Sequence, residues 1–124
     1  MAFKIQIVFD SRDPARLAKF WAAALHYKFQ GQWGTSCAIV DPDVAGPRIF
    51  IQKLATPKPR KNRLHIDINA SPGKKMALSE RRKSVNAEVR RLARIGAKKM
   101  RVEEFEGEYW VVMRDPDGNE FCVQ

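Results

Sequence analysis

Apolar and polar residues alternate at the start of the chain, and the spacing then changes to that of a helix. Between Phe3 and Phe9 every second residue is apolar, which predicts a β-strand over 3–9 with one apolar face. Further on, apolar residues recur at helical spacing, in a stripe made of Leu17, Phe20, Trp21, Ala24 and Leu25. Asp13 and Pro14 precede this stripe and are typical of a helix N-cap and first helical position. The pattern predicts a strand followed by an amphipathic helix, with Trp21 in the core.

Three shorter strand-like segments follow this helix, at 27–33, 35–40 and 48–54, separated by breaks rich in glycine or proline. The stretch after them, 55–63, contains Pro57 and Pro59. Because proline excludes a regular helix or a central strand, this stretch is predicted to be an exposed connector.

The same order of elements then recurs. Alternation predicts a strand near 64–68, and a helical stripe predicts a second helix built on Val85, Val89, Leu92 and Ala93. Ser79 or Ser84 can cap the start of this helix, and Gly96 is expected to end it at the C′ position. Strands are predicted near 98–103, 108–114 and 119–124, and a tight turn joins the last two.

Both halves therefore consist of a strand, a helix and three further strands. This βαβββ repeat predicts an α+β fold rich in antiparallel pairing, with both helices on one side of the sheets. We expect a single domain over 1–124, with module one at about 1–55, the connector at 55–63 and module two at about 64–124.

Charge is distributed unevenly over these elements. The 124 residues include 23 Lys and Arg against 14 Asp and Glu, a net charge of +9. Residues 58–101 hold 15 of the basic residues and three acidic ones, so this stretch carries +12 and the rest carries −3. Such an excess leaves nucleic-acid binding open. However, no recognition motif is present, and a charged helix face is more often simply solvated, so nucleic acid is an unlikely partner.

Other global features are those of an ordinary cytoplasmic protein. The longest apolar run covers residues 20–25, far short of the roughly 20 residues that span a bilayer. No signal peptide is visible at the N-terminus. Cys37 and Cys122 form no CxxC motif and are expected to be free thiols. These features predict a cytoplasmic protein without a membrane partner.

Four segments carry a resemblance to a known family: 13–27, with DPARLAKFW leading into LHY; 61–68, KNRLHIDI; 92–97, LARIGA; and 115–123, DPDGNEFCV. In this order and spacing they resemble the glyoxalase-like and bleomycin-resistance branch of the vicinal oxygen chelate (VOC) superfamily. The resemblance covers nearly the whole chain and implies two βαβββ modules whose mixed sheet curls around a ligand-holding cup. It also implies a homodimer. His26 stands where the family usually has glycine, and is expected to be an exposed left-handed cap.

The resemblance also implies where a metal would bind. Metal-dependent relatives use four ligands, typically two His and two Glu, from the first and last strands of each module. Those positions fall here on Gln6, Gln52, His65 and Cys122, and Glu120 lies two residues before Cys122. Two neutral amides give little charge for a hard divalent ion, and amides are unusual partners for zinc. The sequence therefore does not establish any cofactor. If a divalent metal binds, its weak candidate ligands are His65, Glu120 and Cys122.

A cup of this kind is expected to be lined by polar and aromatic residues. The ligand-binding candidates are Gln6, Phe50, Gln52, His65, Asp67, Trp110, Glu120 and Cys122. Asp67 is expected to pair with His65 or with a basic group. The resemblance then implies a small-molecule-binding protein without the full metal site. The alternative is a metal-dependent glyoxalase-type lyase, isomerase or related enzyme acting on a small oxygenated substrate, with Glu120 as the weak catalytic candidate. The sequence leaves open whether any reaction is catalysed and which ligand is bound.

Overall fold

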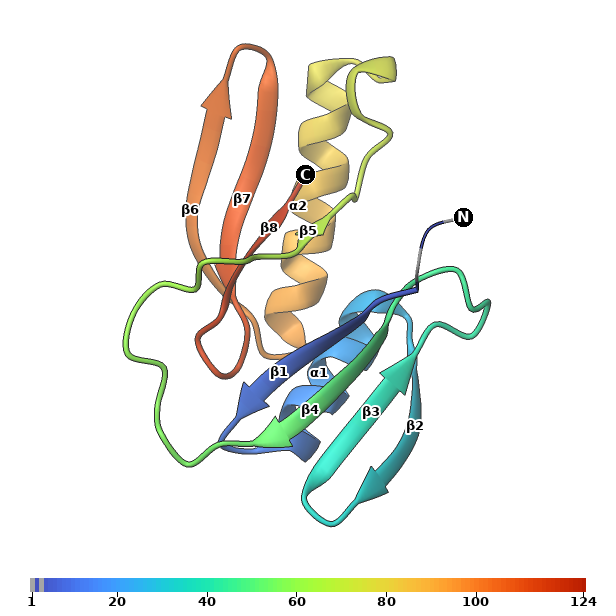
Figure 1. Cartoon of the computed structure of the whole chain (residues 1–124). Coiled ribbons are helices and arrows are strands. Elements are labelled where there is room, and N and C mark those ends of the chain that lie inside the picture. Colours follow the sequence, from blue (N-terminus) through green and yellow to red (C-terminus); the bar gives the residue numbers. More distant parts are fainter. Residues whose placement is uncertain (1, 3) are drawn as a thin grey trace. The chain divides into compact units, whose positions relative to one another are not determined.

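The computed structural model describes Ala2 and residues 4–124, and it divides the chain into two compact units (Figure 1). Unit 1 ends at Pro57, and unit 2 covers Lys58–Gln124. The boundary lies inside the connector predicted at 55–63. Each unit contains one strand, one long α-helix and three further strands, in that order.

Unit 1 is built from β1 (Gln6–Ser11), α1 (Pro14–Leu25), β2 (Lys28–Trp33), β3 (Ser36–Val40) and β4 (Arg48–Lys53). Its four strands form one sheet in the order β1-β4-β3-β2. The pairing of β1 with β4 is parallel, and the other two pairings are antiparallel.

Unit 2 repeats this topology with β5 (Asp67–Ile68), the short 3-10 helix η1 (Gly73–Lys75), α2 (Leu78–Arg94), β6 (Lys98–Phe105), β7 (Glu108–Arg114) and β8 (Glu120–Val123). The strand order is β5-β8-β7-β6, again with the first and last strands of the unit parallel. The predicted α+β class and the βαβββ repeat are confirmed. The strands form two four-stranded mixed sheets that are not closed into a barrel.

Helix α1 forms where the sequence predicts it. The Asp13 carboxylate accepts a hydrogen bond from the backbone N–H of Arg16 at 3.2 Å, and Pro14 occupies the first turn. The apolar stripe is buried except for Leu25, which is half-buried, and Trp21 stacks on Phe9 of β1 with ring centroids 5.7 Å apart. His26 closes the helix in the left-handed conformation, at φ 57°, and is exposed. The predictions for Trp21 and His26 are confirmed.

Helix α2 begins differently from the prediction. Its N-cap is Ala77, whose methyl group cannot accept a hydrogen bond from the first turn. Neither Ser79 nor Ser84 is therefore the N-cap. The predicted stripe is also wrong at Ala93, which is exposed because the buried face runs through Arg81, Val85, Val89 and Leu92. Gly96 follows the helix at φ 121°, the C′ position predicted for it.

The first strands of both units are shorter than the alternation predicts. Strand β1 begins at Gln6; Ile5 precedes it and is 71% exposed, and Phe3 lies outside the described residues. Strand β5 has only two residues, and Leu64 before it is 76% exposed. The ladder between β5 and β8 covers only two residue pairs, Asp67 with Cys122 and Ile68 with Val123.

Many basic side chains of unit 2 are paired with acidic ones. Examples among the described residues are Lys74 with Glu108, Arg82 with Glu104, Lys83 with Glu80, Arg91 with Glu88, and Arg101 with Glu103. Several of these acids lie on β6 and β7, outside or at the edge of the basic stretch. No helix of the described residues is long and apolar enough to span a membrane.

Candidate functional site

The candidate residues of unit 1 share the sheet face opposite helix α1. Side chains alternate between the two faces of a strand, and Ile49 and Ile51 of β4 are buried on the face that Phe9 and α1 occupy. Phe50 and Gln52 therefore lie on the other face. Gln6 joins them, because β1 and β4 are in parallel register with Gln6 opposite Arg48. The three predicted positions are thus on one surface of one sheet.

Arg48 is the centre of this surface. Its Nη1 donates to Gln6 Oε1 at 2.5 Å and its Nε donates to Gln30 Oε1 at 2.6 Å. The guanidinium carbon lies 5.6 Å from the ring centroid of Trp33 and 5.4 Å from that of Phe50. A guanidinium at these distances is attracted by the ring faces. We call Arg48, Gln6, Gln30, Trp33 and Phe50 the Arg48 cluster.

The second amide of unit 1 is also occupied. Gln52 Nε2 donates to the Asp10 carboxylate of β1 at 2.8 Å. Sequence reasoning missed Arg48, Gln30 and Asp10 as members of this surface. The period of two in the segment 48–54 was a usable signal, since it places Arg48 on the same face as Phe50 and Gln52.

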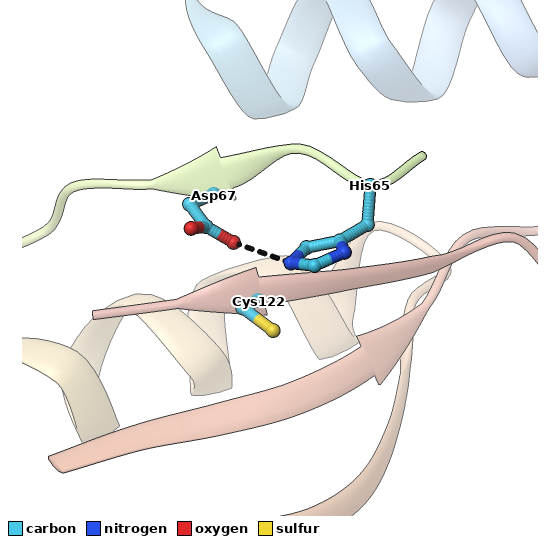
Figure 2. A group of neighbouring side chains, drawn as sticks. All are labelled: His65, Asp67 and Cys122. Atoms are coloured by element: carbon cyan, nitrogen blue, oxygen red, sulfur yellow. Dashed lines mark ion pairs between the residues drawn. The ribbon is translucent and has the colours of Figure 1, made fainter. Parts of the chain in front are cut away.

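In unit 2 the structure brings together His65, Asp67 and Cys122 (Figure 2). Asp67 opens β5 and stands opposite Cys122 in the parallel register of β5 and β8, while His65 lies just before β5. His65 Nε2 is 3.2 Å from Asp67 Oδ1, the first of the two pairings expected for Asp67. One potential ligand atom from each of the three residues lies within 4.8 Å of the others.

The surroundings of Cys122 keep its thiol protonated. Burial raises the pKa of this thiol, and the nearby Asp67 carboxylate raises it further, while Arg101 and Lys61 oppose that effect only in part. A free thiol with a raised pKa is a weak nucleophile at neutral pH. The arrangement gives no support to nucleophilic catalysis by Cys122.

Glu120 has a different set of contacts. Its side chain is 10% exposed, Oε1 accepts from Lys58 Nζ at 3.1 Å, and Oε2 accepts from the Asn62 backbone N–H at 3.1 Å. A second hydrogen bond joins the same two residues, because Asn62 Oδ1 accepts from the Glu120 backbone N–H at 2.9 Å. Burial raises the pKa of Glu120, but the hydrogen bonds from Asn62 and Lys58 outweigh burial and leave the pKa below its ordinary value. Glu120 is therefore an ionised carboxylate that fastens the connector to β8, and the metal-capable group of unit 2 does not include it.

Trp110 lies on the same face as Cys122. The residue before it, Tyr109, donates its hydroxyl hydrogen bond to Asn86 of α2, so Tyr109 faces the helix and Trp110 the opposite side. Trp110 is two residues from Val112, which is paired with Cys122. The aromatic candidate of unit 2 is thus on the surface that carries the three polar residues.

These donors do not fit a hard divalent ion held by two His and two Glu. The Gln6 side chain accepts a hydrogen bond from the Arg48 guanidinium, which is itself a cation. The Gln52 side chain donates a hydrogen bond to the Asp10 carboxylate. Of the four transferred positions only His65 has a residue type that the resemblance implies. Hard ions need several charged or carbonyl oxygens, so this set lacks the required charge.

Comparison with known proteins identifies the family. The model of the glyoxalase-like domain matches residues 6–124, and the chain belongs to this family. No curated protein sequence matches the chain significantly.

Solved structures show the same fold at low sequence identity. A glyoxalase/bleomycin resistance protein/dioxygenase family enzyme from Burkholderia phytofirmans has a TM-score of 0.73 and 13% identity, covering 95% of this chain and 94% of that one. A possible glyoxalase from Bacillus cereus has a TM-score of 0.70 and 14% identity, with 100% and 99% covered. A variant of the fosfomycin resistance protein FosX from Listeria monocytogenes, complexed with Mn(II) and 1S,2S-dihydroxypropylphosphonic acid, has a TM-score of 0.72 and 16% identity, with 100% and 90% covered. At these identities the likeness shows the fold and leaves the specific function undetermined.

Proposed function

We propose that this chain is a small-molecule-binding member of the glyoxalase-like family that binds an organic ligand without the four-ligand metal centre. The observation that carries the proposal is the Arg48 cluster. In this cluster the Arg48 guanidinium donates a hydrogen bond to the amide oxygen of Gln6. Metal-dependent relatives have a metal ligand at the position of Gln6. A cation fixed at that position repels a second cation and attracts an anion.

The Arg48 cluster favours a particular ligand chemistry. The hydrogen bonds to Gln6 and Gln30 use Nη1 and Nε, and they hold the planar fork in one orientation. Guanidinium groups recognise carboxylates and phosphonates through paired N–H donors. Trp33 and Phe50 offer flat apolar surface beside that charge. We therefore infer a small anionic ligand with an apolar or planar part. The phosphonic acid bound by the Listeria FosX variant is a ligand of this charge type.

The remaining ligand-binding candidates are proposed for each unit by itself. They are Gln52 in unit 1, and His65, Asp67, Trp110 and Cys122 in unit 2. Members of the family often form homodimers, and we propose a cytoplasmic homodimer for this chain as well. Light scattering over a range of protein concentrations would test the dimer.

The enzymatic alternative has less support. It requires Glu120 to move a proton, which a carboxylate can do only if it reaches the substrate. The contacts of Glu120 with Lys58 and Asn62 favour a structural role instead. If an activity is found, an unchanged rate in Glu120→Gln would exclude a mechanism based on this residue.

The proposal is tested by calorimetry with a panel of aryl carboxylates and phosphonates and their uncharged isosteres. Wild-type protein should bind at least one anion and ignore its neutral isostere, and EDTA should leave that affinity unchanged. Arg48→Gln should weaken binding by about tenfold or more, since a charge-assisted hydrogen bond contributes about 1.5–3 kcal/mol. Arg90→Gln changes an exposed arginine of α2 and is the matched control. Equal binding of neutral isosteres, loss of binding in EDTA, or full affinity in Arg48→Gln would overturn the proposal.

A further inference from the structure

We propose that the face of the unit 1 sheet opposite α1 binds a zwitterionic organic ligand, whose acidic group lies at Arg48 and whose cationic amine lies at Asp10. An apolar part of the ligand joins the two ends. The inference rests on the proposed function and deepens it, because it gives the ligand of the Arg48 cluster a second charged end. Asp10 is the residue with the new role, since neither the resemblance nor the Arg48 cluster includes it.

The register of β1 and β4, which lie side by side in Figure 1, arranges this face in three rows. The three pairs of opposite residues are Gln6 with Arg48, Val8 with Phe50, and Asp10 with Gln52. Side chains two positions apart on a strand leave the same face, so all three rows share one surface. The cation of the first row and the carboxylate of the third row are therefore at opposite ends of that surface.

The row between the two charges is apolar. Val8 is 49% exposed, and Phe50 is half-buried. Ala38 of β3 stands opposite Phe50 in the antiparallel register and continues the row with a methyl group. An aromatic or hydrocarbon part of a ligand that covers this row removes apolar surface from water, which favours binding.

The Asp10 carboxylate has the contacts and the access that an amine requires. Asp10 is exposed, and within the described part of the chain it forms no ion pair with a Lys or Arg. Gln52 Nε2 donates to Asp10 Oδ1 at 2.8 Å, and an ionised carboxylate can accept about three further hydrogen bonds. This hydrogen bond uses the amide nitrogen of Gln52 and leaves the amide oxygen as another acceptor. An ammonium group, with three donors and no acceptor, suits such a pair of side chains.

The spacing of the charged rows sets the length of the ligand. Gln52 is four positions after Arg48 on β4, and a strand rises about 3.3 Å per residue, so these rows are about 13 Å apart. The Arg48 guanidinium carbon lies 5.4 Å from the ring centroid of Phe50 in the middle row, which shortens the span between the charges. We expect the charges of the ligand to be about 9–13 Å apart. A simple α-amino acid is too short to reach both rows.

Calorimetry with two pairs of para-substituted benzoates tests the proposal. The long pair compares a terminal aminobutyl chain with a pentyl chain, so an ammonium replaces a methyl group at the same length. The short pair compares an aminomethyl group with an ethyl group, and its amine falls short of Asp10. Wild-type protein should bind the aminobutyl ligand about fivefold more tightly than the pentyl ligand, the gain expected of one exposed ion pair. The short pair should show no such gain.

Two variants assign the gain to one carboxylate. Asp10→Asn removes the charge and keeps an acceptor for Gln52, so it should abolish the fivefold gain and leave the affinity for the pentyl ligand unchanged. Asp43→Asn makes the same change at an exposed position of the same unit, and this matched control should keep the gain. The comparison of the long and short pairs uses the wild type alone, so it does not depend on the folding of a variant.

Equal affinity of the wild type for the two long ligands, an equal gain in the short pair, or a gain that persists in Asp10→Asn would overturn the proposal. The failures of this inference and of the proposed function are distinguishable. If the pentyl ligand binds and Arg48→Gln weakens it, but the amine adds nothing, only the zwitterionic ligand is wrong. If neither these ligands nor any other anion binds, the proposed function and this inference are both wrong.

Discussion

Arg81 is a cation on the buried face of helix α2, and it is only 8% exposed. Its Nε donates to the Met76 carbonyl at 3.1 Å and its Nη2 donates to the Gly107 carbonyl at 2.9 Å. The guanidinium is also 3.6 Å from a Glu108 carboxylate oxygen. It therefore joins the segment before α2 to the turn between β6 and β7.

Replacing this residue should destabilise the fold. We expect Arg81→Met to lower the free energy of unfolding by about 1–3 kcal/mol, because the carbonyls of Met76 and Gly107 lose the donor of two part-buried hydrogen bonds. Urea unfolding followed by circular dichroism measures the change. Arg90→Met, at an exposed position of the same helix, should stay within about 0.5 kcal/mol of the wild type. Equal effects of the two substitutions would contradict the role of Arg81.

Glu120 should make stability depend on pH in the acidic range. A carboxylate whose folded pKa is below its unfolded value stabilises the protein above the unfolded pKa, about 4.3 for Glu, and this contribution is lost as pH falls through the folded pKa. At neutral pH we expect Glu120→Gln to lower the free energy of unfolding by about 1–3 kcal/mol.

The measurement is urea unfolding of both proteins between neutral pH and about pH 3. The gap between wild type and Glu120→Gln should narrow on acidification, since both side chains become neutral. Glu106→Gln changes an exposed turn residue and serves as control. A gap that stays constant over this range would show that the Glu120 charge does not stabilise the fold.

The contacts of a candidate residue were predictable where the alternation of a strand places two side chains on the same face. Asp67 and His65 are two apart on one strand segment, so their pairing follows from the alternation. By contrast, Lys58 and Asn62 reach Glu120 from far along the chain. No local pattern encodes such a contact. The sequence therefore left Glu120 as a candidate ligand, whereas in the structure its carboxylate holds the connector against β8.

At the scale of elements, the end of α1 is a place where the sequence departs from the family. His26 has φ 57°, a conformation that costs a residue with a Cβ about 1–2 kcal/mol. We expect His26→Gly to raise the free energy of unfolding by about 0.5–1 kcal/mol, and His26→Val to lower it. Thermal unfolding of the three proteins checks the order Gly, His, Val. A less stable glycine variant would contradict the assignment of the cap.

The elements themselves were predictable to different degrees. Helix α1 has both a capping side chain and a proline at its start, and its first residue was found. Helix α2 starts after Ala77 without a side-chain cap, and the nearby serines misled the prediction. Alternation does not show how many residues of a segment find a pairing partner, so the two-residue length of β5 could not be derived from 64–68.

For the whole molecule, the net charge of +9 overstates the attraction for nucleic acid. Acids on β6 and β7 pair with basic side chains of η1 and α2, as Glu104 does with Arg82. We expect no binding of duplex DNA at about 0.15 M salt, because nonspecific attraction weakens steeply as salt rises. Fluorescence anisotropy with a labelled duplex tests this. Micromolar binding at that salt concentration would show that the pairs leave an effective basic surface.

The repeat was predictable from the order of elements, whereas the pairing of strands was not. The parallel contacts of β1 with β4 and of β5 with β8 join residues at opposite ends of each unit. Alternation identifies a strand but not its neighbour. The order of elements predicted the two modules, and the family resemblance added the curled mixed sheet.

That parallel pairing bears on how the chain folds as it is made. In each unit the first strand pairs only with the last one, so neither sheet can be completed before its final strand leaves the ribosome. The pairings of β1 to β4 become available once Lys53 has left the ribosome. Since domains generally fold as units during translation, the N-terminal sheet can form while unit 2 is still being made. Vectorial synthesis then reduces the chance that β1 pairs with the equivalent last strand of the other repeat, β8.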